Sequence, residues 1–288
     1  EYPSDLQTIT DAYKDSDTLR AAFNDSYELH NDNFYNDKVF AEASKENNIL
    51  GYDFTKYLPI MYNIGSANFN LGTVVEPDDV SGTNADREKI TYRTTENNPV
   101  TYKLTDDEIA RITYDYHQLV DQAFQKGMES FSATLKKYGL VYRQQAYNPP
   151  IDTLKSSKYV DIPETEGLDE MQLKRVTSGA HLYGKNLITS EVYTLGSVPY
   201  TLTPSFIKEG YDLMATAGVT NFFYHGLNAP YYGTDAQKAA GTWGEEGWRA
   251  WPTIGIEMNE TDALAKYYKT LNMYAARNNY VMQAGKQS

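Results

Sequence analysis

The alternation of strand-like and helix-like segments constrains the fold of this chain more than any other feature of its sequence. Extended, partly apolar runs are predicted at residues 19–29, 140–147, 158–167, 186–195 and 220–227. Helical patterns separate several of these runs. A strand, a loop and a helix, repeated about five times, are typical of a parallel sheet with crossover helices.

Boundary signals mark three of the helices. Thr105 and Glu108 form a capping box, and Gly139 ends the apolar repeat that follows them. Further helices are predicted at residues 203–218 and 262–285. In the last helix, the residues expected to face the core are Leu264, Tyr267, Leu271, Tyr274 and Val281.

A barrel explains the polar residues at the strand ends better than an open nucleotide-binding sheet does. No glycine-rich phosphate fingerprint follows any predicted strand. In (β/α) barrels the active site lies at the C-terminal ends of the strands. The polar residues at these ends are Glu28, Gln145, Glu164, Glu191 and His225.

The predicted fold class is therefore α/β, a (β/α)8 TIM-type barrel. A full barrel has eight strands, and with about five visible, residues 1–288 are expected to form an incomplete one. Residues 64–102 are rich in Gly, Asn, Thr and Asp without clear periodicity. They are predicted to be a surface insertion.

Composition narrows the possible functions. A formal net charge of -13 argues against a nucleic-acid partner, which would demand a basic surface. The sequence has no Cys, and its 4 His are scattered, so no zinc site is expected and catalysis falls to carboxylates. The 26 Tyr, 10 Phe and 3 Trp suit sugar faces, although Tyr also packs well in ordinary cores.

The ends of the chain and its hydropathy bear on location. The chain begins without Met or a signal peptide, so a processed product or a segment of something longer is expected. It contains no apolar run long enough to predict a membrane span.

Two carboxyl groups, one neutral and one ionised, are the minimum for cleaving a glycosidic bond. Glu28 and Glu164 end two different strands and could face each other across a barrel mouth. The alternative for each is a solvated loop acid or a helix cap. Asp25 and Asp161 each precede such a Glu by three positions. Either could hold a hard cation such as calcium, orient its neighbour, or simply support the loop.

Other candidates also have two interpretations. Glu191 is a third candidate site carboxylate, which could bind hydroxyls or contact a metal. His225 could donate to a sugar hydroxyl, although a lone His beside aromatic residues is more often structural. A cluster of Trp243, Trp248 and Trp251 is equally well a stacking platform or a hydrophobic loop anchor.

Seven blocks, in order along the chain, resemble the catalytic barrel of glycoside hydrolase family 106, the alpha-L-rhamnosidases. The blocks are DSYE (25–28), GYDFTKYLP (51–59), YGLVYRQQAYNPPIDT (138–153), VDIPETE (160–166), SGAHLYGKNLITSEVYT (178–194), GVTNFFYHG (218–226) and YAARNNYVMQAGK (274–286).

The resemblance implies an inverting, calcium-dependent glycosidase that acts on a rhamnose-containing glycan or glycoside and is secreted or periplasmic. By motif, Glu28 takes the place of the general acid and Glu164 that of the general base. Asp25 and Asp161 are the candidate metal ligands. The candidate substrate-binding residues are Glu191, His225, Gln145, Arg143 and Tyr193.

Two other functions remain open from the sequence. One is a carbohydrate-binding barrel without hydrolytic activity, and the other is a barrel glycosidase for a different sugar. For an inverting enzyme, the carboxyl groups of Glu28 and Glu164 are expected about 6.5 to 9.5 Å apart, which leaves room for a water molecule.

Overall fold

The computed structural model describes residues 2–27, 41–43, 45, 48–58, 89–93, 99–103, 105–145, 151–194, 202–226, 256, 258 and 262–285. The chain divides into two compact units. Unit 1 comprises Glu1–Ser26, Ser132–Tyr147 and Thr153–Ser288, and unit 2 comprises Tyr27–Phe131 and Asn148–Asp152.

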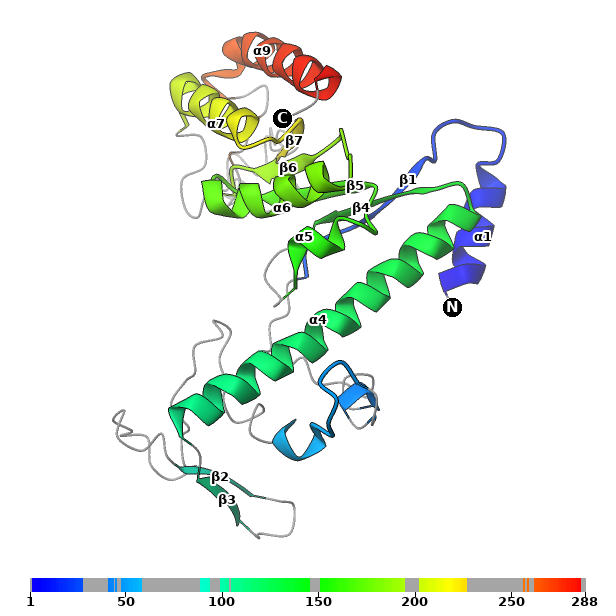
Figure 1. The fold of residues 1–288 in the computed structure, drawn as a ribbon. Helices are drawn as coiled ribbons and strands as arrows, with labels where there is room; N and C mark the ends of the chain where they lie inside the picture. The colour runs from blue at the N-terminus through cyan, green and yellow to red at the C-terminus, as the bar shows by residue number, and fades with distance from the viewer. Residues whose placement is uncertain are drawn as a thin grey trace, which may run out of the picture. The chain divides into compact units, whose positions relative to one another are not determined.

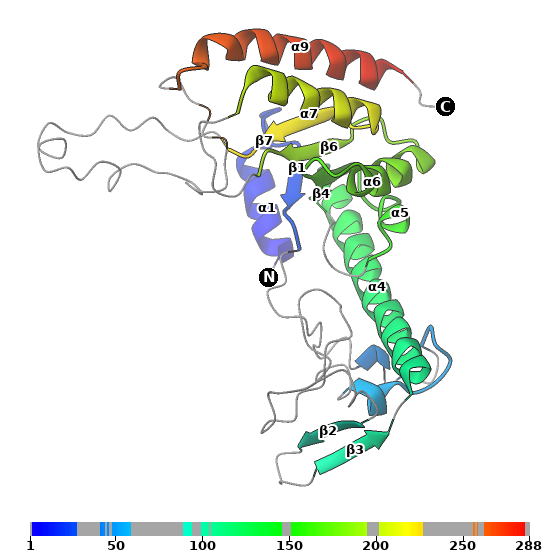
Figure 2. The same ribbon diagram turned by 90° about the vertical axis from the view of Figure 1, so that its left-hand side faces the viewer.

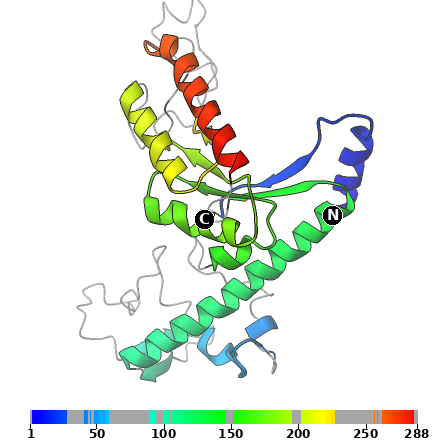
Figure 3. The same cartoon turned by 45° about the horizontal axis from the view of Figure 1, so that its top comes forward.

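Unit 1 is built on a five-stranded sheet whose strands are all parallel and follow one another in chain order (Figure 1). Each strand lies within a predicted extended run. The sheet curls, with helices between its strands, like part of a (β/α) barrel (Figure 3), which confirms the predicted fold class. The strands are β1 (Ala21–Asn24), β4 (Val141–Gln145), β5 (Ile162–Glu166), β6 (Thr189–Val192) and β7 (Asn221–Tyr224).

Of the described helices of unit 1, α6, α7 and α9 pack on one face of this sheet. Two of them, α7 and α9, lie side by side (Figure 2), and both were predicted. Helix α6 follows β5 and was not predicted as a helix. The helices are α1 (Tyr2–Ala12), α5 (Thr153–Ser156), α6 (Glu170–Leu182), α7 (Pro204–Thr216) and α9 (Ala265–Ala284).

Side-chain caps begin two of these helices. Thr203 accepts a hydrogen bond from the backbone nitrogen of Phe206 at 3.3 Å, ahead of Pro204 at the start of α7. Asp169 accepts one from the nitrogen of Gln172 at 2.8 Å at the start of α6. Each cap satisfies a helix N–H that has no partner within the helix.

A core between the sheet and the helices holds unit 1 together. Val192 and the partly buried Phe222 face the helices, where they pack with Leu173 of α6, Met214 of α7 and Leu271 of α9. Burying a large apolar side chain contributes about 1.5–3 kcal/mol. The helix-covered side is called the outer face of the sheet below, and the opposite side is called the inner face.

Unit 2 contains most of α4 (Asp106–Lys137), a helix that begins in unit 2 and ends in unit 1. Its predicted capping box is present, because the backbone nitrogen of Thr105 donates to Glu108 Oε2 at 2.8 Å and the Glu108 nitrogen donates to Thr105 Oγ1 at 3.3 Å. Gly139 follows the helix with a left-handed φ of 71°, as its predicted role as a stop requires.

The core of unit 2 packs along α4. Tyr116 and Leu119 of α4 bury against Phe54, which precedes a short 3-10 helix, η1 (Thr55–Tyr57). Within the predicted insertion, β2 (Lys89–Arg93) and β3 (Pro99–Lys103) pair as an antiparallel hairpin. The sequence had not indicated these two strands.

Among the described residues, no helix combines the length and apolar character needed to cross a membrane.

Candidate active site

The inner face of the five-stranded sheet gathers polar side chains from neighbouring strands. Residues paired in register across a parallel sheet project to the same face, and successive residues alternate between faces. The pairings place these residues on one face: Phe23, Arg143, Gln145, Glu164, Glu166, Thr189, Glu191 and Phe223.

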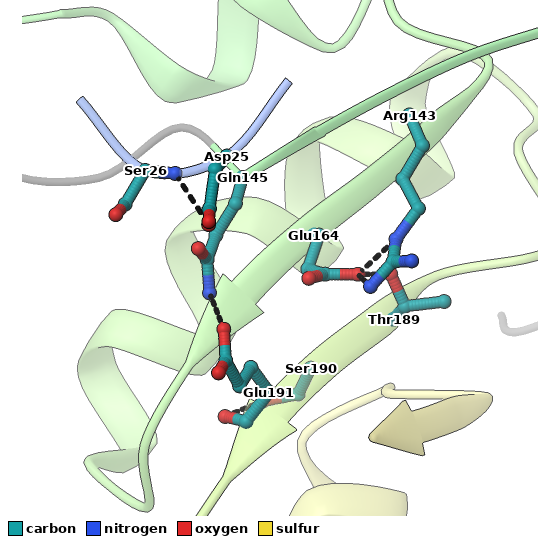
Figure 4. A network of polar contacts seen from close by, with 8 residues as sticks. All are labelled: Asp25, Ser26, Arg143, Gln145, Glu164, Thr189, Ser190 and Glu191. Atoms are coloured by element: carbon teal, nitrogen blue, oxygen red, sulfur yellow. Dashed lines mark hydrogen bonds and ion pairs between the residues drawn. The ribbon is translucent and has the colours of Figure 1, made fainter. Parts of the chain in front are cut away.

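Glu164 forms the buried centre of this face. Its side chain is 0% exposed, and its Oε2 lies 2.5 Å from both Nε and Nη2 of Arg143. Thr189 donates a hydrogen bond to the same oxygen, as Figure 4 shows. The other oxygen, Oε1, is buried and has no hydrogen-bond partner among the described residues. A buried carboxylate oxygen is costly to leave unpaired, so this atom is suited to accept a hydrogen bond from a ligand or a water molecule.

Two aromatic rings cover the guanidinium of Arg143. Its Cζ lies 4.0 Å from the ring centroid of Phe23 on β1 and 3.9 Å from that of Phe223 on β7. These strands form the two edges of the sheet, so only a curled sheet brings both rings to one side chain of β4. Arg143, a candidate for substrate binding, is thus held by protein groups on several sides.

A second polar group forms where β4 and β6 end. Gln145 Nε2 donates to Glu191 Oε2 at 3.0 Å, and His225 Nε2 lies 4.0 Å from Glu191 Oε1. Gln145 is buried, while the Glu191 side chain is 25% exposed. Figure 4 shows the hydrogen bond between these two side chains. Beside it, Thr194 donates to Glu166 Oε1 at 2.7 Å. Gln145, Glu191 and His225 are therefore brought together, as expected for residues at the C-terminal ends of parallel strands of one curled sheet.

The surroundings of Glu191 favour its protonated form. Burial raises the pKa of Glu191, and the nearby charges of Glu166 and Asp25 raise it further, whereas the hydrogen bond from Gln145 and the charge of His225 oppose the shift. A half-buried carboxyl of this kind can exchange a proton or accept hydrogen bonds from a bound polyol.

Tyr193 lies in the core and not with the other candidates. It is only 1% exposed, and its hydroxyl donates to the carbonyl oxygen of Ile207 in α7 at 2.6 Å. Burial raises its pKa well above the usual range. Its backbone has a left-handed φ of 70°, which breaks the alternation that would otherwise place it on the same face as Glu191.

The two candidate metal ligands lie at opposite ends of the parallel strands. Asp25 follows β1, is exposed, and accepts a hydrogen bond from the nitrogen of Ser26 at 2.8 Å. Asp161 precedes β5, where its Oδ2 accepts from the Tyr142 nitrogen at 3.0 Å and its Oδ1 lies 3.9 Å from Lys185 Nζ.

Calcium prefers six to eight oxygen ligands. In the part of the chain that the structure describes, no group of three or more acidic or histidine side chains is placed to hold a metal ion. Asp25 and Asp161 therefore do not share one calcium site.

Some of the predicted site lies outside the described residues. Glu28 and the three Trp residues of the loop at 243–252 belong to this group. The expected distance between the carboxyl groups of Glu28 and Glu164 therefore stays a prediction.

Four of these inner-face residues had not been singled out from the sequence: Phe23, Glu166, Thr189 and Phe223. The available signal was the period of two within each strand, which places Phe223 on the same face as His225 and Thr189 on the same face as Glu191. The curl of the sheet brings Phe23 and Phe223 to Arg143, and the residue pattern of a single strand does not predict this curl.

Comparisons with known proteins bear on the fold and the family of the chain. One solved structure, of a rhamnosidase from Novosphingobium sp. PP1Y, matches 99% of the chain with a TM-score of 0.59 and 17% sequence identity. The chain spans 24% of that rhamnosidase's length. No match was found among curated proteins. A family model described as alpha-L-rhamnosidase, glycoside hydrolase 106, matches residues 2–288. The chain therefore belongs to the alpha-L-rhamnosidase family, glycoside hydrolase 106.

Proposed function

We propose that this chain carries the catalytic face of an inverting alpha-L-rhamnosidase, which removes terminal alpha-L-rhamnosyl residues from a glycan or glycoside. The observation that supports this proposal most strongly is the inner face itself. There, two acidic side chains with different environments, Glu164 and Glu191, lie on adjacent strands among amide and hydroxyl groups. Glycoside hydrolysis requires two carboxyl groups of different character; Glu164 is proposed as one of them, Glu28 as the other, and Glu191 as a group that binds the substrate beside them.

Glu164 is the proposed general base. Arg143 and Thr189 both engage its Oε2, so Oε1 is left to accept a hydrogen bond from the attacking water. An ion-paired carboxylate held in place by two neighbours can take a proton from that water without first reorienting. Glu28, by its position in the DSYE motif, is the proposed general acid that protonates the departing oxygen.

Glu191 is proposed to bind substrate hydroxyls together with Gln145 and His225. Its exposure makes it the replacement candidate for a catalytic role if Glu164 proves too enclosed to reach a water molecule. The proposed roles can be separated by replacing each acid with its neutral isostere.

The test compares Glu28→Gln, Glu164→Gln and Glu191→Gln in the native protein that carries this sequence. With an aryl alpha-L-rhamnoside, the first two variants are expected to lose turnover, by at least about 100-fold if each acts in proton transfer. Glu191→Gln is expected to raise KM more than it lowers kcat. Glu170→Gln, an exposed site on α6, is the matched control. If Glu164→Gln kept near-wild-type turnover while Glu191→Gln lost it, Glu191 would replace Glu164 as a catalytic carboxyl group.

Product stereochemistry tests the mechanism independently of these variants. Proton NMR during the first minutes of hydrolysis should show beta-L-rhamnose before mutarotation, because single displacement inverts the anomeric carbon. Initial release of the alpha anomer would contradict an inverting mechanism. Rhamnose binding without turnover would favour a carbohydrate-binding barrel, and preference for another aryl glycoside would favour a different sugar.

A further inference from the structure

Arg143 is surrounded in a way that leaves it little freedom. Its guanidinium carries two short contacts to Glu164 Oε2 and lies within 4.0 Å of the ring centroids of both Phe23 and Phe223. The side chain is 20% exposed. Stacking on aromatic faces and pairing with a carboxylate both suit the flat guanidinium group better than they suit an ammonium group.

Each of these contacts comes from a different strand. Phe23 lies on β1, Arg143 on β4, Glu164 on β5 and Phe223 on β7. Thr189 of β6 completes the set by donating to the same carboxylate oxygen. The contacts of one guanidinium and one carboxylate thus involve every strand of the five-stranded sheet.

Glu164 depends on this arrangement because it is fully buried. A buried carboxylate without a partner is strongly unfavourable. Since both Arg143 and Thr189 use Oε2, the carboxyl plane is fixed and Oε1 is held in one direction. A displacement of about 1 Å in a reacting group can cost on the order of 100-fold in rate.

We infer that Arg143 is a positioning residue for the Glu164 carboxylate rather than a ligand of the sugar, and that Phe23 and Phe223 form an aromatic clamp that holds Arg143 in place. This inference rests on the proposed role of Glu164. It assigns to two exposed aromatic residues of the inner face a function in aligning the proposed base.

The test measures kcat, KM and rhamnose affinity separately. In Arg143→Lys the charge stays but the flat group is lost, and in Arg143→Met both are lost. Both variants are expected to lower kcat, Arg143→Met by about 100-fold, with KM and the calorimetric Kd for rhamnose unchanged. Phe23→Leu and Phe223→Leu keep the ion pair and are expected to lower kcat by a smaller factor, again with KM unchanged. Arg175→Met, at an exposed position of α6, is the matched control.

Chemical rescue distinguishes positioning from general support of the fold. Adding guanidinium ion at low, non-denaturing concentration to Arg143→Ala is expected to restore part of kcat, because the ion can occupy the space between the two rings. Should Arg143→Met fail to fold by circular dichroism, Phe223→Leu carries the test, since the ion pair remains.

A rise in KM and a weaker rhamnose Kd at unchanged kcat would show that Arg143 binds the sugar, which overturns the inference alone. Unchanged kcat in both Phe→Leu variants would remove the aromatic clamp. Full kcat in Glu164→Gln, or a wild-type protein without rhamnosidase activity, would instead overturn the proposed function, and the inference with it.

Discussion

Phe23 and Phe223 lie on strands at opposite edges of the five-stranded sheet, yet both rings contact the guanidinium of Arg143. The Cζ atom of Arg143 lies 4.0 Å from the ring centroid of Phe23 and 3.9 Å from that of Phe223. In a flat sheet, strands about 4.8 Å apart would separate these edges too widely for one side chain to touch both. The shared contact is therefore a direct consequence of the sheet's curl. It also contributes to stability at the place where the polar residues gather.

Phe223→Leu is expected to destabilise the protein by about 0.5–1 kcal/mol, because it removes a partly exposed cation-π contact while keeping an apolar side chain. Phe206→Leu on α7 is the matched control, since Phe206 and Phe223 are both 40% exposed and Phe206 has no cation-π contact within the described residues. Urea denaturation of the native protein measures both. An equal loss in the two variants would mean that contact with Arg143 contributes no more to stability than the contact of Phe206 with Tyr193, whose ring centroids lie 6.3 Å apart.

Gly210→Ala in α7 is expected to destabilise by about 1–3 kcal/mol through overpacking. A Cβ at this position would lie 2.6 Å from the hydroxyl oxygen of Tyr193 and 3.1 Å from its Cε1. Tyr193 cannot easily give way, since it is buried and bonded to Ile207. Thermal or chemical unfolding provides the measurement.

Gly127→Ala in α4 is expected to stabilise the protein, in contrast to Gly210→Ala in α7. Nothing lies within 4 Å of the added Cβ, so stability should rise by about 0.5–1 kcal/mol.

Combining Gly210→Ala with Tyr193→Phe should cost less stability than the sum of the two single changes, because the second change removes the hydroxyl oxygen, which is the atom nearest to the added Cβ. Strict additivity would show that the clash with the hydroxyl is not the cause.

The positions of the five strands of the parallel sheet could be predicted from the sequence, because each combines β-forming residues with a boundary signal, whereas β2 and β3 were not predicted. Tyr193 shows where such reasoning fails. A period of two places it on the same face as Glu191. Its left-handed φ of 70° reverses the alternation and sends it into the core against α7. A positive φ in a tyrosine has no signature in the surrounding sequence.

The start of α6 has a sequence signal that was overlooked, whereas the width of the buried face of α9 has no sequence signal. Asp169 and Gln172 carry the spacing of a helix start, and α6 could have been predicted from them. In α9, the predictions for Tyr267 and Val281 were wrong, since these side chains are 45% and 66% exposed. Only a narrow stripe of α9, including Leu271 and Ala275, is buried, and its width depends on packing with α7 rather than on periodicity.

Asp169→Ala tests the N-cap of α6, the helix that was not predicted from the sequence. Losing the hydrogen bond from the Gln172 nitrogen is expected to cost about 1 kcal/mol, the usual effect of removing an N-cap side chain. Asp169→Asn keeps an accepting oxygen and is expected to cost much less. Guanidinium chloride denaturation of the three proteins compares them. Equal destabilisation by Ala and Asn would indicate that the negative charge near the helix N-terminus, rather than the cap itself, is what matters.

Glu191→Gln is expected to change how stability depends on pH. The pKa of Glu191 is raised in the folded protein, chiefly by burial, so the folded state binds this proton more tightly than the unfolded state does. Its contribution is fully present below the unfolded pKa, about 4.3 for Glu, and is lost as pH rises through the folded value. Because glutamine does not titrate, and can still accept the hydrogen bond from Gln145, the variant should gain stability relative to wild type between pH 4 and pH 7.

The measurement is the difference in unfolding midpoint between variant and wild type at several pH values across that interval. Glu170→Gln reports the effect of the same substitution at an exposed position on α6. Calcium chelation during the titration serves as a further control, because a bound cation near Glu191 would favour its ionised form and oppose the expected trend. A difference that shrinks as pH rises would mean that Glu191 is better stabilised when ionised, by groups such as His225, than its burial indicates.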